Sequence, residues 1–261
     1  MNDDVISKPA VLIAGMGEVG RRLRDGALHQ GHEVTTLGRR DDLAAAIGTH
    51  VGPIVLAMRE DDLGQALTRV PTSRANDLVI VQNGFIDSLL ETHPGHTRVV
   101  VWFTSKGEFF ASARESLASG PHAEVCASWI AAHEVPARVE RVEVVLQEAR
   151  EKAAWSCLVG PALAAHRCSY AQMFSERRED AQRIVYEACD MASRTLDATV
   201  TREGAWAMVE ACVGSLGWMR GGTKGLAFRN GCVVRWAEEL GDGMAAVMNG
   251  EVLRLLAQNE L

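Results

Sequence analysis

The fold of this chain is decided by the stretch Ala10-Val11-Leu12-Ile13-Ala14-Gly15-Met16-Gly17-Glu18-Val19-Gly20. Five apolar residues lead directly into a Gly-x-Gly-x-x-Gly motif, and a charged segment with helical spacing follows. The motif alone is weak evidence, but a preceding strand and a following helix make it typical of a Rossmann dinucleotide-binding unit. The glycines let backbone N–H groups at the positive end of the helix approach phosphate. We therefore expect residues 15–20 to bind the pyrophosphate of a nicotinamide dinucleotide; the alternative is a strand-to-helix turn without a ligand.

Short apolar runs and amphipathic segments alternate over the first hundred residues. Runs rich in Val, Ile and Leu predict strands over residues 10–14, 34–37, 54–58, 78–82 and 99–103. Apolar residues at helical spacing predict helices over residues 21–29 and 61–70. This order is typical of a parallel sheet with crossover helices. We assign residues 1–142 to an N-terminal α/β Rossmann domain that binds the cofactor.

Helical patterns dominate the second half of the chain. A long segment over residues 143–166 has few helix breakers, and residues 180–196 place their apolar side chains on one face. The pattern returns over residues 233–240, just before Gly241, a glycine placed to end a helix. We therefore expect residues 143–261 to form an all-helical C-terminal domain for substrate binding and dimerisation. Aromatic residues on these helices are compatible with a homodimer.

Composition excludes several classes of function. The 261 residues carry 27 Lys and Arg against 34 Asp and Glu, a net charge of −7, so we expect no nucleic-acid partner. The N-terminus lacks the pattern of a secretory signal, and no stretch approaches the roughly 18 apolar residues of a membrane span. Six cysteines without a CxxC pair are typical of small buried thiols in a reducing compartment. We expect a cytoplasmic protein with no metal site and no membrane contact.

The second predicted strand ends without the acidic residue that binds ribose hydroxyls in NAD-preferring folds. The sequence there reads Val34-Thr35-Thr36-Leu37-Gly38-Arg39-Arg40, with two arginines directly after a small residue. Guanidinium groups suit a 2′-phosphate, which a carboxylate would repel. We therefore predict NADP as the cofactor, with Arg39 and Arg40 on its extra phosphate. The alternative is a solvated loop in which Asp41 and Asp42 balance the arginines.

Later segments resemble the ketopantoate reductase family, the NADPH-dependent 2-dehydropantoate 2-reductases. Residues 54–59 look like the family's third strand, and Val81-Gln82-Asn83-Gly84 is similar to its Asn-Gly signature beside the nicotinamide. Lys152 falls where the family places its catalytic lysine, and residues 230–241 resemble the helix that closes its C-terminal domain. The resemblance spans nearly the whole chain. It implies cofactor contacts by Met58, Arg59, Asn83 and Gly84, of which Arg59 stands where a lysine is usual.

The sequence departs from the family pattern at most of its polar substrate positions. A glutamate, an aspartate, two asparagines and a substrate-binding serine of the family are replaced, in that order, by Gly225, Ala227, Ser156, Gly160, and Cys212 or Val213. Unpaired buried polar groups of ketopantoate would each cost about 1–3 kcal/mol there. We therefore expect a different substrate. A larger biosynthetic intermediate would need a wider, more apolar cleft around Val213, Gly225 and Gly160.

Lys152 and Asn83 are the candidate catalytic residues. A lysine ammonium within hydrogen-bond reach can stabilise a developing alkoxide and donate its proton, provided that burial lowers its pKa. Asn83 can orient the substrate or the lysine through its amide. The alternative for Lys152 is a solvated lysine on an exposed helix face, paired with Glu148 four residues earlier.

For the other polar and aromatic residues, a structural role is favoured over a functional one. Arg220 and Lys224 stand in a glycine-rich segment, where an interhelical turn is favoured over an anion site. The histidines lack metal-ligand spacing, and we expect surface or hydrogen-bonded positions for His122, His133 and His166. Core packing is the default for four tryptophans on predicted helices, Trp155, Trp206, Trp218 and Trp236.

The sequence therefore predicts an NADP-dependent reductase acting on a small carbonyl or imine compound, with ketopantoate-reductase-like architecture and an altered substrate. The rival hypothesis is a protein that binds NADP without turning it over, such as a redox sensor or an assembly partner. The cofactor half of the sequence is intact and the substrate half is altered, so the sequence is compatible with both hypotheses.

Overall fold

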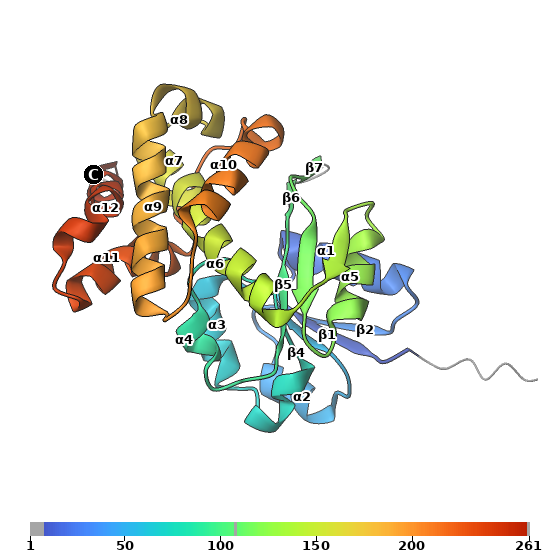
Figure 1. The fold of residues 1–261 in the computed structure, drawn as a ribbon. Helices are drawn as coiled ribbons and strands as arrows, with labels where there is room; N and C mark the ends of the chain where they lie inside the picture. The colour runs from blue at the N-terminus through green and yellow to red at the C-terminus, as the bar shows by residue number, and fades with distance from the viewer. Residues whose placement is uncertain (1–7, 107–108, 260–261) are drawn as a thin grey trace, which may run out of the picture.

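The computed structural model describes residues 8–106 and 109–259. They form two parts side by side, a sheet with helices on both faces and a cluster of helices that begins with α6 (Figure 1). This arrangement confirms the expected α/β class with a Rossmann half followed by a helical half.

Seven strands form the main sheet in the order β2-β1-β3-β4-β5-β8-β9. Strands β1 to β5 are parallel to their neighbours, β8 is antiparallel to β5, and β9 is parallel to β8. The strands are β1 (Val11–Ala14), β2 (Val34–Leu37), β3 (Ile54–Leu56), β4 (Leu78–Ile80), β5 (Thr97–Val100), β8 (Ser116–Ser119) and β9 (Ala137–Val139). The first four lie where the sequence predicts strands, because buried strands of a parallel sheet read as continuous apolar runs.

Helices bury both faces of this sheet. Val11 and Ile13 of β1 pack in one apolar cluster with α1 (Glu18–His29) and α5 (Ala123–Ala131). Leu12 and Ala14 point to the opposite face, as alternate residues of a strand must. That second cluster is completed by α2 (Leu43–Thr49), α3 (Glu60–Leu67) and α4 (Asp87–Leu90).

The predicted strand over residues 99–103 is wrong at its end. Strand β5 stops at Val100, and the chain leaves the sheet because the backbone N–H of Trp102 donates to Ser116 Oγ at 2.9 Å. Phe103 then begins a separate antiparallel hairpin of β6 (Phe103–Lys106) and β7 (Phe109–Ser112). This hairpin rises from the sheet and lies between α1 and α10 (Figure 1).

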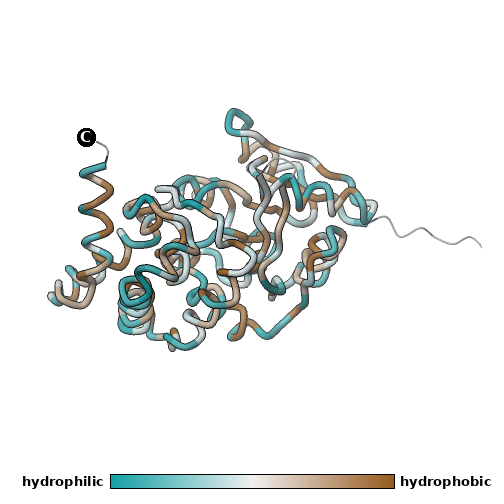
Figure 2. Tube along the Cα trace, turned by 90° about the horizontal axis from the view of Figure 1, so that it is seen from above, coloured by the Kyte–Doolittle hydropathy of each residue, from teal (hydrophilic) through white to brown (hydrophobic). Residues whose placement is uncertain are grey.

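The helical half surrounds α9. Its elements are α6 (Val142–Cys157), a π-turn over Leu158–Ala162, α7 (Leu163–Ala165), α8 (Tyr170–Glu176), α9 (Arg178–Thr195), α10 (Arg202–Leu216), a 3₁₀ turn over Leu226–Phe228, α11 (Asn230–Glu239) and α12 (Val247–Asn259). Helices α6, α8, α10, α11 and α12 all contact α9. Figure 2 shows polar and apolar residues alternating along α12, at the end of the molecule farthest from the sheet.

Burial follows the predicted apolar faces with one exception. Ile184, Val185 and Ala188 of α9 are fully buried, as expected. Leu240 was expected on the buried face of α11, but it is 46% exposed because the helix ends at Glu239. Gly241 follows with a φ of +66°, a conformation typical of the residue after a helix. Five of the six cysteines are buried, and Cys168 is partly exposed. No helix in the described part of the chain is long and apolar enough to cross a membrane.

Candidate active site

The glycine loop joins β1 to α1 in a geometry that only glycine allows. Gly15 has a φ of +102°, and a Cβ on it would lie 2.7 Å from the backbone of Ala57 and Met58. A Cβ on Gly20 would lie 1.9 Å from the carbonyl oxygen of Gly15, so the helix packs tightly on the loop. Gly17 differs, since a Cβ there would meet no atom within 4 Å. The start of α1 therefore faces open space, as a diphosphate site requires.

A cavity of about 660 Å³ lies in front of this loop. Of the predicted cofactor residues, those that line it are Gly15, Met16, Gly17, Arg39, Met58 and Arg59. Glu18, Gly20 and Arg40 are not part of its wall, and Val19 lines a neighbouring cavity instead. Arg69, which sequence reasoning missed, also lines the large cavity. Its only signal was its position just after the helix that follows β3.

The two aspartates that follow the arginines are held by backbone N–H groups. Asp41 accepts a hydrogen bond from the backbone N–H of Gly38 at 2.6 Å, and Asp42 caps α2 by accepting from Ala45 N at 3.1 Å. Both carboxylates therefore serve the backbone rather than balance the arginines. Arg39 is 84% exposed and lies 3.7 Å from Asp62, a separation at which a solvated ion pair is weak. Its guanidinium remains available to a ligand in the cavity.

Asn83 and Gly84 form the turn after β4, where the two halves of the molecule touch. Gly84 has a φ of +85°, and a Cβ on it would lie 2.8 Å from the carbonyl oxygen of Phe228. The backbone N–H of Phe85 donates to the same oxygen at 2.8 Å. The turn is thus fixed to the segment before α11, and Asn83 faces a second cavity between the halves.

Lys152 is buried on α6, with only 4% of the residue exposed. Its Nζ donates to the carbonyl oxygen of Val101 and lies 4.7 Å from the centre of the Trp102 ring. The alternative of a solvated lysine paired with Glu148 is therefore wrong. Glu148 instead accepts from Trp102 Nε1 at 2.7 Å and pairs with Arg114 at 3.4 Å. The sequence correctly predicts that Lys152 lies on a helix. Local sequence gives no signal of the segment after β5 that buries it.

The surroundings of Lys152 lower its pKa from the ordinary value to about 7. Burial is the largest cause, because it penalises the charged ammonium, and the positive charge of Arg98 adds to it. Glu148 acts in the opposite direction. A lysine with this pKa holds and releases a proton near neutral pH, the range in which general acid catalysis is efficient.

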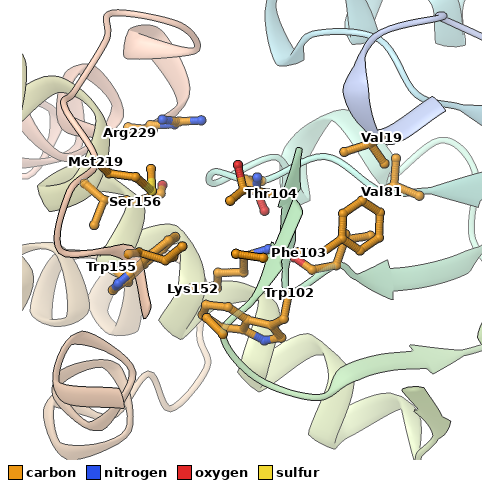
Figure 3. Close-up of a pocket in the computed structure, with 16 residues that line it drawn as sticks. Val19, Val81, Trp102, Phe103, Thr104, Lys152, Trp155, Ser156, Met219 and Arg229 are labelled. Atoms are coloured by element: carbon orange, nitrogen blue, oxygen red, sulfur yellow. Dashed lines mark hydrogen bonds between the residues drawn. The ribbon is translucent and has the colours of Figure 1, made fainter. Parts of the chain in front are cut away.

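The second cavity, of about 180 Å³, brings the two candidate catalytic residues together. Lys152 and Asn83 both line it, and Figure 3 shows Lys152 and Arg229 reaching into it from the helical side, with Val19, Val81 and Phe103 opposite. Its full wall is Val19, Val81, Asn83, Val101, Trp102, Phe103, Thr104, Ala111, Ala113, Lys152, Trp155, Ser156, Val159, Leu216, Met219 and Arg229. Since α1 contributes Val19 here while its glycine loop lines the larger cavity, the two cavities are neighbours.

Arg229 is the main residue of this site that sequence reasoning missed. It directly precedes the Asn230-Gly231 pair and pairs with Glu60 of α3 at 3.4 Å. Asn230 itself is fully buried and donates to Asn249 of α12 at 2.9 Å, so its role is to hold two helices together. The position beside that pair was the one available signal for Arg229.

The cleft is not widened where the family's polar residues are replaced. Nη1 of Arg229 lies 2.5 Å from the position of a Cβ on Gly160, and Glu60 Oε2 lies 3.0 Å from that of a Cβ on Gly225. These two side chains fill the space that the glycines leave. Ser156 lines the cavity, with its Oγ donating to Ala153 O at 2.7 Å. The wide apolar cleft that a larger intermediate would need is therefore not formed at Gly160 and Gly225.

The other polar candidates lie outside both cavities. Arg220 forms an isolated backbone bridge with Ser169, in keeping with a turn between helices, and Lys224 is exposed. His133 Nε2 lies 2.7 Å from the carbonyl oxygen of Arg22. The buried Nε2 atoms of His122 and His166 have no hydrogen-bond partner among the described residues, but that of His122 lies 3.8 Å from Asp77 Oδ1. Within the same ranges, no group of three or more His, Cys, Asp or Glu could hold a metal.

The four tryptophans expected in the helical core divide into three positions. Trp206 and Trp236 are buried in it. Trp155 belongs to the same core and also lines the smaller cavity. Trp218 is half exposed, because α10 ends at Leu216 before reaching it. Trp102, two residues after β5, also lines the smaller cavity, and the sequence did not single it out.

Solved structures share this architecture over nearly their whole length. A D-mandelate dehydrogenase in complex with NADH is 15% identical, with 96% of this chain and 98% of that chain covered and a TM-score of 0.73. A ketopantoate reductase from Ralstonia eutropha is 15% identical, with 97% and 100% covered and a TM-score of 0.74. A dimeric ketopantoate reductase from Staphylococcus aureus is 16% identical, with 97% and 100% covered and a TM-score of 0.66. No protein-family model and no curated protein matches the chain. The chain therefore has the ketopantoate reductase fold.

Proposed function

From the ketopantoate reductase fold of this chain, we propose that it is an NADPH-dependent reductase of a small 2-oxo acid. The observation that carries the proposal is the buried Lys152, with a pKa of about 7, in the cavity that adjoins the glycine loop. Solved proteins with this fold include reductases and dehydrogenases of 2-oxo and 2-hydroxy acids, one of them described in complex with NADH. The smaller cavity, of about 180 Å³, suits a small substrate.

The residues around the larger cavity fit a dinucleotide. The first turn of a helix leaves backbone N–H groups without intrahelical partners, and at α1 these groups lie beside the open position of Gly17. Asn83, in the turn after β4, lines the smaller cavity, and the proposal assigns the nicotinamide end of such a ligand to its neighbourhood. When bound, the reduced dinucleotide supplies a hydride to the substrate carbon.

Lys152 supplies the proton in this proposal. Its ammonium group donates a hydrogen bond to the substrate carbonyl oxygen and gives up its proton as that oxygen becomes a hydroxyl, leaving a neutral amine. The oxygen of Val101 and the ring of Trp102 hold Nζ in place meanwhile. Asn83 orients the substrate through its amide, which does not titrate. Hydride and proton together convert C=O into CH–OH.

Arg39 supports NADPH as the donor. It lies at the wall of the larger cavity, well exposed, while the carboxylates of Asp41 and Asp42 are held by backbone amides. Its guanidinium group can therefore bind a 2′-phosphate. Arg40 does not line that cavity, so the proposal assigns this role to Arg39.

The test is NADPH oxidation with a panel of 2-oxo acids, aldehydes and imines, with wild type beside Lys152→Ala. Turnover that is lost in the variant, with NADPH binding preserved, supports the reductase. Tight NADPH binding with no turnover on any substrate would instead support the rival hypothesis of a sensor or assembly protein. Turnover of imines alone would replace the 2-oxo acid with a C=N substrate.

A further inference from the structure

We propose that Arg229 binds the carboxylate of the substrate, and that the apolar side chains of the same cavity select a 2-oxo acid with an apolar side group. This inference rests on the proposed reductase function and names the residue that fixes its substrate class. It is carried by the position, charge and packing of Arg229 in the smaller cavity.

Among the described residues, Arg229 has fewer hydrogen-bond partners than its guanidinium group has N–H donors. Its side chain is 13% exposed, and its buried Nε has no hydrogen-bond partner among the described residues. Nη2 donates to Glu60 Oε1 at 3.4 Å, a long bond between two charged groups. A guanidinium carries five N–H donors, so most of its capacity is left for a ligand. Figure 3 shows its terminal nitrogens pointing toward the middle of the cavity.

The surrounding backbone is built to admit this side chain. Gly160, in the π-turn after α6, leaves the space that Nη1 occupies, because a Cβ there would lie 2.5 Å from that atom. Gly225 does the same for the carboxylate of Glu60. Glu60 comes from α3 and Arg229 from the start of α11, so the pair also connects the two halves. Glu60 thereby holds the guanidinium group of Arg229 in its orientation.

The charge of the cavity favours an anion. Lys152 and Arg229 both line it, and none of the described residues that form its wall is acidic. A 2-oxo acid presents a carboxylate directly beside its carbonyl group. Arginine binds such a carboxylate through two parallel hydrogen bonds, whereas the lysine suits the single carbonyl oxygen. The two cations therefore have separate roles on adjacent groups of one substrate.

Apart from Asn83, Thr104 and Ser156, the rest of the wall is apolar. Trp102 and Trp155 pack against each other with ring centres 5.3 Å apart, and Leu216 and Met219 extend this surface. A side group with hydroxyl or charged substituents would lose its hydrogen bonds to water there. A compact aliphatic or phenyl group would bury its surface instead.

The experiment compares phenylglyoxylate with its neutral primary amide. In wild type, kcat/KM with NADPH should favour the acid. In Arg229→Met, the ratio of the acid value to the amide value should fall by about 10- to 100-fold, the usual effect of a hydrogen bond to a charged group. Glu60→Gln/Arg229→Met is the matched double variant, because it avoids leaving Glu60 buried without its partner. It should show the same fall in the ratio.

The single variant Glu60→Gln removes the negative charge of Glu60 and keeps a side chain of nearly the same size. It removes the competing carboxylate and keeps Arg229, so it should increase the preference for the acid. An acid-to-amide ratio unchanged in both Arg229 variants would overturn the assignment, and so would a lower ratio in Glu60→Gln.

Direct binding keeps this test separate from the test of the reductase function. Trp102 and Trp155 line the cavity, so their fluorescence reports phenylglyoxylate binding to wild type with NADP present, even without turnover. Binding that is lost in the Arg229 variants supports the inference on its own. Equal affinity in wild type and variants would overturn it, whatever the enzyme assay shows.

Discussion

The Nζ atom of Lys152 lies over the face of Trp102, 4.7 Å from the ring centre. The indole N–H of Trp102 donates to Glu148 at 2.7 Å, so the carboxylate one turn before the lysine is held away as a partner of the ring. The buried lysine thus contacts the face of the Trp102 ring and a backbone carbonyl oxygen, and no residue in the described part of the chain forms an ion pair with it. This arrangement makes its proton easy to remove.

The rate of reduction should therefore fall as the pH rises through about 7. The pKa of Lys152 is lowered to about 7, and only the protonated form can donate to the substrate. Measuring kcat/KM with NADPH between pH 5.5 and about 9.5 checks this. Lys152→Met should lose at least about 100-fold in activity and retain NADPH binding. A flat profile over this range would argue against Lys152 as the proton donor.

The same burial should make Lys152 destabilising at neutral pH. The folded pKa of about 7 lies below the unfolded value of about 10.4, so between these pH values the unfolded chain holds a proton that the folded chain lacks. The free energy of unfolding of wild type should rise with pH across this window, by up to about 4 kcal/mol from this group. Lys152→Met should lack the contribution and be more stable than wild type near pH 7. Urea unfolding of both proteins at pH 7 and pH 9 measures the difference, which should narrow at the higher pH.

Arg98→Met should raise the pKa of Lys152. Arg98 is buried on β5, and its positive charge is the second cause of the low lysine pKa. The midpoint of the pH–rate profile should move upward by about half a unit to one unit. Because Arg98 Nη2 also donates to Gln82 O at 2.8 Å, next to Asn83, KM should rise as well. Arg138→Met, at an exposed arginine of β9, is the matched control and should leave the midpoint unchanged.

Gly17→Val should abolish cofactor binding without unfolding the protein. A Cβ at this position meets no protein atom within 4 Å, and the backbone there is extended, so a side chain is tolerated. The added side chain would occupy the approach to the first turn of α1, and the Kd for NADPH should rise by at least about 100-fold. Thermal unfolding and NADPH fluorescence measure the two effects. Gly214→Ala, in helix α10, is the control and should bind NADPH normally.

Arg39→Ala should weaken NADPH binding much more than NADH binding. Removing a charge-assisted contact with the 2′-phosphate should raise the Kd for NADPH by about 10- to 100-fold. NADH lacks that phosphate, so its Kd should change by no more than about threefold. Calorimetric titration of both cofactors gives the comparison. An equal loss for the two would remove Arg39 from the specificity site.

The first four strands and the glycine turn of the cofactor half were predictable because their signals are local. A strand, a glycine turn and a helix start are written in consecutive residues, and buried parallel strands read as apolar runs. Local patterns also placed Lys152 on a helix and Asn83 at a strand end. They failed where the chain leaves regular structure, since the hydrogen bond from Trp102 to Ser116 that ends β5 joins residues 14 positions apart.

The sequence by itself determined a Rossmann half that starts with a strand, a glycine turn and a helix, because each of those features depends on neighbouring residues. Only the tertiary structure decided the chemistry of the cleft. The sequence leaves Lys152 either a catalytic lysine or a solvated partner of Glu148, and only its burial beside Val101 excludes the solvated position. Arg229 meets Glu60 across 169 residues of sequence. The physical reason is that burial and charge neighbours set the pKa and the free hydrogen-bond donors of a site, and both arise from the packing of distant segments.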